Sequence, residues 1–272
     1  MEQVKEDNRI RPRSLKGVLF LAVGLLLLGW LLHTPEGLLG KADAIGYAVC
    51  HRIDERSFHL GERQVPLCAR CSGMFLGAML GLAYQAATGC RRSEMPTWTV
   101  WVILALFVLA FGADGTNSYL TLLLGRAMLY EPNNTLRLLT GTGMGIVMAA
   151  VFFPVFNQTV WKDRDDRRAL NGLRPLAGLV ALGLLLDLIL LTEQPIFLYP
   201  LALLSAAGIL VLLTMLYCVL LLIAFRAENR IQTAAQLVLP LVGGFGMALA
   251  QVALIDWVRF WLTGTWGGFP LG

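Results

Sequence analysis

Long apolar runs constrain this chain more than any other feature of its sequence. The runs reach the roughly 18 residues that a helix needs to cross a hydrocarbon core of about 30 Å. Lipid cannot satisfy exposed backbone N–H and C=O groups, so each run must be helical. The sequence therefore predicts an all-α, polytopic transmembrane helix bundle of about seven spans: 17–32, 71–87, 98–113, 135–156, 176–191, 198–225 and 234–257.

The overall composition excludes an ordinary soluble domain. Charged residues make up 15% of the chain and hydrophobic residues 57%, with a mean hydropathy of +0.66. A globular chain is about one quarter charged. The net charge of +4 is not gathered in a nucleic-acid-binding motif, so no nucleic acid is expected as a partner. The expected partners are membrane lipids and, in one interpretation, other membrane protein subunits.

The distribution of basic residues predicts which way the bundle points. The N-terminal tail and the segments 88–97, 158–174 and 226–232 carry 14 of the 22 basic residues, so the positive-inside rule places them in the cytoplasm. The expected parts are a cytoplasmic basic tail (1–16), a membrane core (17–157), a cytoplasmic loop (158–174) and a three-helix membrane extension (175–272). Six spans, the alternative count, would move the C-terminus to the other side. The first span is expected to be a retained anchor.

Metal-binding side chains are concentrated at one predicted membrane edge. All three histidines and three of the five cysteines lie in a 39-residue stretch, and most of it is the predicted extracytoplasmic loop 33–70. Thiols and imidazoles bind zinc and similar divalent ions or carry thiol–disulfide chemistry. Cys50, Cys68, Cys71 and His59 are the expected metal ligands. His51 directly follows Cys50, an awkward position for a second ligand of the same ion, and is expected to act on a substrate.

Other interpretations of these cysteines stay open. On an oxidising face, two of the three could form a structural disulfide. Cys68 and Cys71 form a C-x-x-C motif, which is also compatible with a membrane thiol–disulfide oxidoreductase. A non-catalytic accessory subunit of a membrane complex, with a loop stapled by metal or disulfide, is the third alternative.

A second polar group is expected at the same membrane face. Asp114 is expected to end the third span, and the connection 114–137 leads to Asn134 and Arg137, which share a helix face. A carboxylate can ligate metal or act as a general base, and arginine suits phosphate or carboxylate groups. The plain structural alternative is an Asp114–Arg137 ion pair that closes the connection. The expected catalytic residues are Asp114, Asn134, Arg137 and His51, and the expected substrate-binding residues are Arg126, Arg137 and Arg52.

Two features inside the spans add to this picture. Gly73, Gly77 and Gly81 follow the C-x-x-C motif at four-residue spacing, which permits close approach to a neighbouring helix. Asp187 lies within the fifth span, where an ionisable side chain is costly and marks a functional hypothesis.

Several of these motifs together resemble a family of multi-pass membrane proteins of unknown function. The resemblance covers about a third of the chain, from Cys50 to Gly145. It rests on Cys50-His51-Arg52, Glu55-Arg56-Ser57-Phe58, Gln64, Pro66-Leu67-Cys68-Ala69-Arg70-Cys71-Ser72-Gly73, Asp114-Gly115 and Asn134-x-x-Arg137-x-x-x-Gly141. It implies that the two polar groups form one site, and it brings no activity with it. The expected function is a membrane protein with an extracytoplasmic metal site that acts on a lipid or lipid-linked substrate.

Overall fold

The computed structural model describes residues 12–267, and most of these residues are helical. Most of the basic tail expected at 1–16 lies outside the described residues. The helices are α1 (Pro12–His33), α2 (Gly37–Val49), α3 (Ala69–Thr88), α4 (Trp98–Leu124), α5 (Asn134–Val160), α6 (Leu173–Leu191), α7 (Pro195–Ala224) and α8 (Ala234–Thr263). The short elements are a 3₁₀ turn η1 (Asp54–Arg56) and the strands β1 (Ser57–Leu60), β2 (Arg63–Cys68), β3 (Arg92–Glu94) and β4 (Asp165–Arg168).

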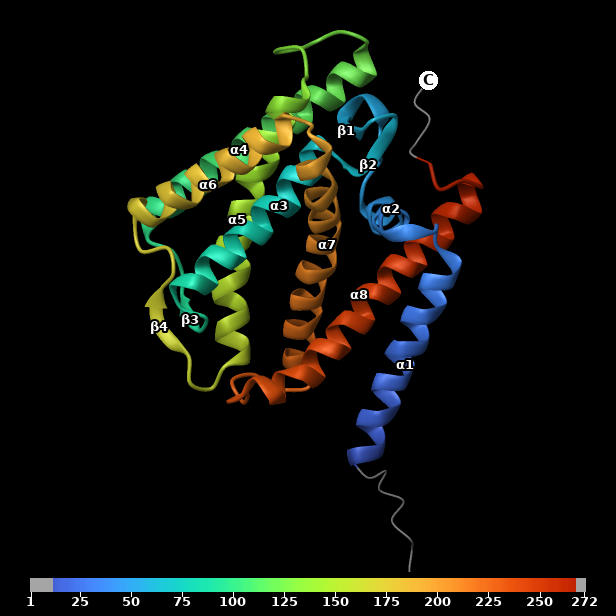
Figure 1. The fold of residues 1–272 in the computed structure, drawn as a ribbon. Helices are drawn as coiled ribbons and strands as arrows, with labels where there is room; N and C mark the ends of the chain where they lie inside the picture. The colour runs from blue at the N-terminus through green and yellow to red at the C-terminus, as the bar shows by residue number, and fades with distance from the viewer. Residues whose placement is uncertain (1–11, 268–272) are drawn as a thin grey trace, which may run out of the picture.

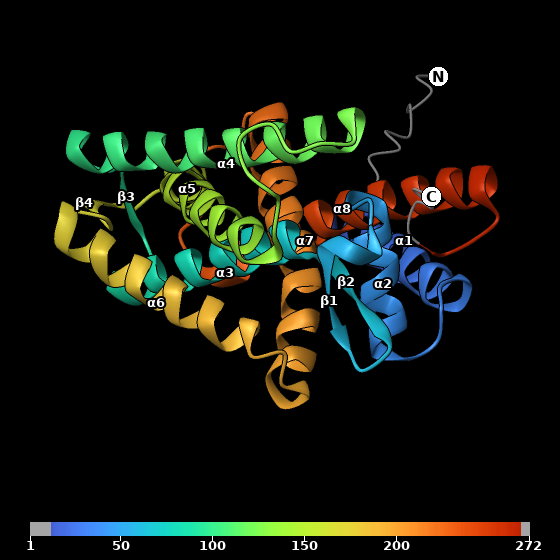
Figure 2. The same ribbon diagram turned by 90° about the horizontal axis from the view of Figure 1, so that it is seen from above.

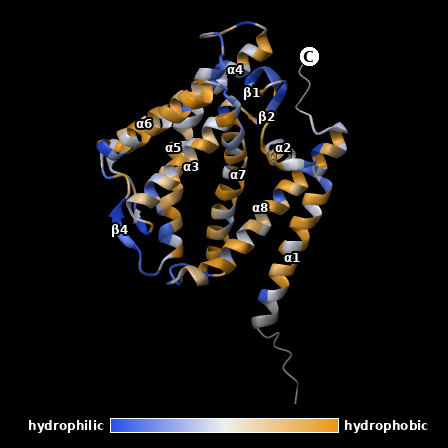
Figure 3. Ribbon diagram, viewed as in Figure 1, coloured by the Kyte–Doolittle hydropathy of each residue, from blue (hydrophilic) through white to orange (hydrophobic). Residues whose placement is uncertain are grey.

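The expected all-α polytopic bundle is confirmed. Within the described part of the chain, six helices are long and apolar enough to cross a membrane: α1, α4, α5, α6, α7 and α8. The remaining expected span is α3, a helix of 20 residues whose Arg70 and Gln85 make it less apolar than the others. Figure 3 shows apolar residues along the long helices and polar residues gathered at β4 and at the β1–β2 hairpin.

The centre of the bundle is a tightly packed pair, α3 and α5. A Cβ atom added at Gly77 would lie 2.6 Å from the Thr142 carbonyl oxygen, and one at Gly145 would lie 2.2 Å from the Met74 carbonyl oxygen. Glycine is therefore required on both helices, and the close approach expected from the glycine spacing is confirmed. Viewed from above, α3 and α5 lie between α4 and α6, and α7 lies between this group and α1, α2 and α8 (Figure 2).

The three connecting segments that the sequence assigns to the cytoplasm lie at one end of the bundle. Strand β3 pairs in parallel with β4, although about 70 residues separate them. The Arg91 guanidinium donates a hydrogen bond of 3.0 Å to the Gln232 carbonyl, and the Lys162 amide donates one of 2.9 Å to the Ile231 carbonyl. Thus 88–97, 158–174 and 226–232 meet at the same end, as their shared assignment requires.

The opposite end holds the β1–β2 hairpin, the α4–α5 connection and the C-terminal end of α8 (Figure 1). Two sequence expectations need correction here. The segment 33–70 is not an open loop, because it contains α2 and the antiparallel hairpin. Asp114 does not end a helix, because α4 continues to Leu124. Partners from other elements satisfy the Asp114 and Asn117 side chains, so these residues do not interrupt the helix.

Candidate metal centre and polar pocket

Three cysteines from separate elements meet at the hairpin end of the bundle. Cys50 follows the last turn of α2, Cys68 ends β2 and Cys71 lies in the first turn of α3. Their Sγ atoms all lie within 4.8 Å of one another. None of the three is in a disulfide, and Cys50 is buried. The structure therefore brings together all three cysteines that the sequence predicts as ligands.

The local packing explains why Cys50 reaches the other two thiols. A Cβ at Gly46 would lie 2.2 Å from the Pro66 carbonyl oxygen, so only glycine lets α2 approach β2 this closely. The backbone amides of Arg52 and Cys68 both donate hydrogen bonds of 3.4 Å to the Cys50 sulfur. Arg52 has a φ of 52°, and this left-handed conformation turns the chain back over the thiol. Cys50 is thus the sulfur best prepared to carry negative charge.

The thiols also act on one another. Hydrogen bonds from the Cys68 thiol and then the Cys71 thiol hold the pKa of Cys50 well below its usual value, and these outweigh the opposing effect of burial. The same interaction with Cys50 raises the pKa of Cys68 to about 12. A group of three thiols in which one ionises most readily is a starting point for metal binding, because thiolates are the ligands.

The C-terminal end of α8 holds the Cys50 turn in place. The Arg259 guanidinium lies 3.9 Å from the ring centre of Tyr47 and donates a hydrogen bond of 2.8 Å to the Cys50 carbonyl. The Arg52 guanidinium donates to the Trp266 carbonyl at 3.1 Å and pairs with Asp43 at 2.9 Å. Arg52, expected to bind substrate, is therefore buried among structural partners beside the cysteines.

The two candidate histidines lie differently from the cysteines. His59 is outside the sulfur group, and its Nε2 lies 2.9 Å from the Asp54 carboxylate. The strand register explains this, because Ser57 faces Cys68 across the hairpin whereas His59 faces Gln64, nearer the turn. His51 has an exposed side chain directly after Cys50.

Asp114 forms the centre of the second polar group. Its side chain is 1% exposed and forms a two-point ion pair with the Arg70 guanidinium. The Tyr130 hydroxyl donates a hydrogen bond of 2.8 Å to the same carboxylate, and the hydroxyl of Thr140 lies 3.4 Å from it. The pKa of Tyr130 is raised, mainly by burial and secondly by this hydrogen bond to Asp114. The alternative ion pair between Asp114 and Arg137 is wrong, because Arg70 takes that place.

Arg137 lies near this group with unused hydrogen-bonding capacity. It is 7% exposed, its Nη1 donates a hydrogen bond of 2.8 Å to the Asn134 side chain, and its buried Nε has no hydrogen-bond partner. The groups that act on its charge are Arg56 and Arg70 on the positive side and Asp114 and Cys68 on the negative side. A buried guanidinium with an unused donor is suited to an anion. Arg126, on the α4–α5 connection, is exposed.

Arg70 joins the cysteine group to the Asp114 group. It stands between Cys68 and Cys71 in the chain, and its side chain reaches α4 to pair with Asp114. Asn134 donates a weak hydrogen bond of 3.4 Å to the Glu55 carbonyl beside the hairpin. The C-A-R-C motif itself was the available signal for Arg70. Tyr130 lies in the connection 114–137 that the sequence marked as polar. No sequence signal pointed to the contacts that Arg259 and Asp43 make with the Cys50 turn, because these join distant segments.

Asp187 lies deeper in the bundle, on α6. Its side chain is 2% exposed, one oxygen accepts a hydrogen bond of 2.6 Å from Thr142, and the other has no hydrogen-bond partner. Asp187 and Thr140 both line a cavity of about 230 Å³ between α4, α5 and α6. Since Thr140 also lies against Asp114, this cavity adjoins the second polar group.

The cysteines and Asp114 lie in the part of the chain that resembles known proteins. A family model described as "Predicted membrane protein (DUF2085)" matches residues 50–151, which include all three cysteines, Asp114 and Arg137. An uncharacterized protein of Methanocaldococcus jannaschii is 31% identical over 121 residues, which cover 44% of this chain and 70% of that one. An uncharacterized protein of Methanothermobacter thermautotrophicus is 34% identical over 103 residues, which cover 38% of this chain and 83% of that one. No solved structure matches the chain.

Proposed function

The chain belongs to the DUF2085 family of predicted membrane proteins, and on that premise we propose that it carries a metal–thiolate centre at one membrane face. The ion is zinc or a similar divalent metal held by Cys50, Cys68 and Cys71. Beside it, Arg137 and Asn134 bind the anionic part of a lipid or lipid-linked substrate. The observation that carries this proposal is the convergence of three thiols within 4.8 Å, one of which, Cys68, acts on the charge of a buried arginine with a free donor.

The three thiols fit a divalent ion. A Zn–S bond of about 2.3 Å in a tetrahedral site separates the sulfurs by about 3.8 Å, so the sulfurs need only a small inward shift from their present spacing. The two backbone amides that point at the Cys50 sulfur stabilise a thiolate there. Three protein ligands leave a fourth position for water or for substrate.

The side chains around the centre take separate roles in this proposal. When bound, the metal supplies a Lewis acid that can polarise a substrate oxygen or activate a water molecule. Arg137 and Asn134 hold the anionic group, and the exposed Arg126 attracts it from solution. Asp114 fixes Arg70 across the gap between α3 and α4. The exposed His51 is in position to move a proton at the membrane surface, and Arg52 positions the Cys50 turn.

Elemental analysis of the purified protein tests this function. About one zinc or similar ion per chain is expected after purification in a mild detergent without chelator. Exposed Cys90 should titrate in the native protein, and the other four thiols only after the protein is denatured in chelator. The second candidate is a thiol–disulfide oxidoreductase, which the short distances between the three free thiols also favour. Two thiols that appear only on reduction, with no bound metal, would exclude the first function and leave the oxidoreductase or an accessory subunit stapled by a disulfide.

The orientation of the centre follows from the basic segments at the other end. The positive-inside rule puts 88–97, 158–174 and 226–232 in the cytoplasm, so the cysteines and Asp114 are on the extracytoplasmic side. In a Cys90→Ser background, a cysteine at exposed Glu131 is expected to react with a membrane-impermeant maleimide added to intact cells. A cysteine at exposed Asp163 is expected to react only after the cells are opened. The reverse pattern would invert the topology.

A role of Arg137 in anion binding can be measured directly. Replacing Arg137 with glutamine is expected to weaken binding of dihexanoyl phosphatidic acid by about ten-fold or more, because a charged hydrogen bond is worth about 1.5–3 kcal/mol. Isothermal titration in detergent gives the affinity, and dihexanoyl phosphatidylcholine serves as the comparison ligand. Arg164→Gln, an exposed arginine at the opposite end, is the matched control. Equal affinities for the wild type and Arg137→Gln would remove the anion from the proposal.

A further inference from the structure

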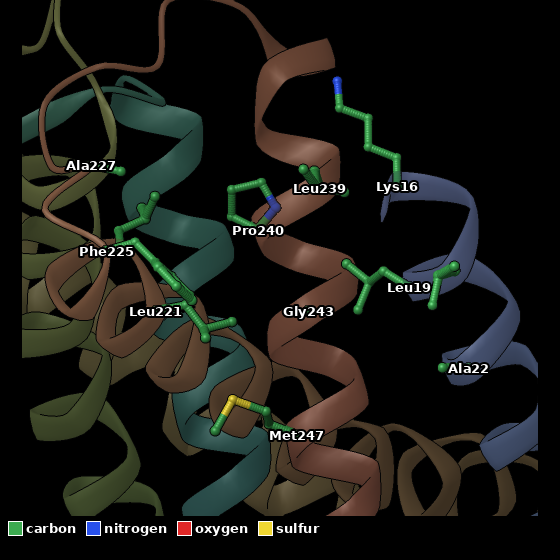
Figure 4. A pocket seen from close by; sticks show the side chains of 12 residues that line it. Lys16, Leu19, Ala22, Leu221, Phe225, Ala227, Leu239, Pro240, Gly243 and Met247 are labelled. Atoms are coloured by element: carbon green, nitrogen blue, oxygen red, sulfur yellow. The ribbon is translucent and has the colours of Figure 1, made fainter. Parts of the chain in front are cut away.

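A groove separates the first turns of α1 from the α7–α8 pair, at the end of the bundle opposite the cysteines. Its volume is about 750 Å³, within the range of roughly 300–1,000 Å³ that small-molecule sites occupy. Figure 4 shows its lining: Leu19 and Ala22 of α1 on one side, Leu221 and Phe225 at the end of α7 on the other, and Leu239, Gly243 and Met247 of α8 between them. These lining residues are apolar, and the polar exception is Lys16 at the mouth.

The groove exists because α1 diverges from α8. The two helices touch where a Cβ at Gly246 would lie 2.7 Å from the Val23 side chain. Farther along, the Trp30 indole donates a hydrogen bond of 3.0 Å to Asp256, which fixes the distal end of α1. Towards Lys16 the helices separate, and the space widens to the end of α1 (Figure 1). The result is a wedge that is closed at Val23 and open at the membrane surface.

Two cationic residues lie near the open end of the wedge. Lys16 lines the mouth, and exposed Arg226 lies between Phe225 and Ala227, which also line the groove. Among residues 12–267, neither takes part in an ion pair. An apolar wedge within the membrane, with unpaired positive charge at its mouth, matches the two halves of an anionic phospholipid.

We propose that this groove binds an anionic phospholipid of the leaflet in which α1 begins, with one acyl chain in the wedge and the phosphate at Lys16, where Arg226 adds positive charge nearby. An acyl chain gains little binding free energy when it moves from the surrounding lipid into an apolar groove. The selectivity among phospholipids therefore comes from the charge of the headgroup. A second copy of this chain is the less suitable occupant. In a symmetric pair, its own Lys16 would approach the first one, and like charges repel. The site is independent of the metal centre.

Native mass spectrometry of the full chain in mild detergent tests the site. Dioleoyl phosphatidylglycerol is expected to remain bound more than dioleoyl phosphatidylcholine, which has the same chains and no net charge. Lys16→Gln is expected to lower the affinity for phosphatidylglycerol about five-fold, the effect of one cationic side chain, whereas Lys16→Arg preserves it. Equal retention of the two lipids, or no effect of Lys16→Gln, would overturn the proposal.

A filled groove provides the complementary test. Ala22→Phe places a ring in the wedge and is expected to reduce the number of tightly bound phosphatidylglycerol molecules by one per chain. Leu25→Phe, on an exposed position of α1 that does not line the groove, is the matched control and should leave the number unchanged. A lipid bound at Arg137 would be present in the wild type and in both variants, so it does not affect the difference in the number of bound lipids per chain. A dimer that Ala22→Phe dissociates, with no lipid lost, would assign the groove to a second copy instead.

Discussion

The substitution Gly145→Val is expected to prevent the native packing of α3 against α5. A Cβ at Gly145 would lie 2.2 Å from the Met74 carbonyl oxygen and 2.6 Å from the Ala78 amide nitrogen. Both are backbone atoms, so no side-chain rotation can relieve the overlap, and the two helices must separate. Overpacking commonly costs about 1–3 kcal/mol, and we expect a loss at or above the upper end of that range. The variant should yield little monodisperse protein in detergent, and any that is recovered should melt at a much lower temperature.

A matched substitution separates this effect from the general cost of valine in a helix. Gly112 lies in α4, and a Cβ there would meet no atom within 4 Å. Gly112→Val should therefore leave the yield and the melting temperature close to those of the wild type. If Gly145→Val has the same melting temperature as Gly112→Val, the α3–α5 contact is not the closely packed centre of the bundle.

The sequence predicted the membrane helices well because their signal is local. Hydrophobic runs report burial in lipid whatever their neighbours are, and the glycine spacing in α3 pointed to a close helix partner. The sequence did not identify that partner, because the reciprocal glycines, Gly141 and Gly145, lie about 70 residues away. Nor did it predict α2. With 13 residues that include Gly37, Gly40 and Gly46, this helix has weak intrinsic preference and depends on its packing against β2, α7 and α8.

The predicted helix boundary was wrong where partners on other elements satisfy a polar side chain. Asp114 was expected to end its helix because a carboxylate at the edge of an apolar run is costly when unpaired. In the structure Arg70 and Tyr130 pair with it, and α4 continues for almost three further turns. Spacing along the chain cannot reveal a partner on another helix, so this error is typical of polar residues in membrane bundles.

The candidate site was predicted in its residue types but only partly in its members. The three cysteines converge, whereas His59, the fourth predicted ligand, is hydrogen-bonded to Asp54 near the hairpin turn. The spacing of His59 from the cysteines along the chain suggested that it could be the fourth ligand. Whether it reaches the sulfurs depends on the register of the β1–β2 hairpin, which was not predicted. Arg259 contacts the Cys50 turn from α8, outside the matched residues 50–151. The C-terminal helices thus support a centre whose thiols all lie in the matched region.

Replacing both Cys68 and Cys71 with serine is expected to reduce the bound metal from about one ion per chain to below about a tenth. Serine hydroxyls are poor ligands for a borderline ion that prefers thiolate, and Cys50 alone cannot hold it. Measured metal contents of the two purified proteins, after identical dialysis, give the result directly. Cys90→Ser is the control, because this exposed thiol lies at the opposite end of the bundle.

Stability should change together with metal content. A bound ion would link α2, through Cys50, to β2 and α3, so its loss removes a connection between elements that are otherwise joined by packing and a few hydrogen bonds. Metal that binds only the folded chain stabilises it by mass action. Chelator should therefore lower the melting temperature of the wild type and of Cys90→Ser, while the double serine variant should melt at the same low temperature with or without chelator. Unchanged metal content in that variant would exclude the three-cysteine centre, because the ion would then have to be bound elsewhere.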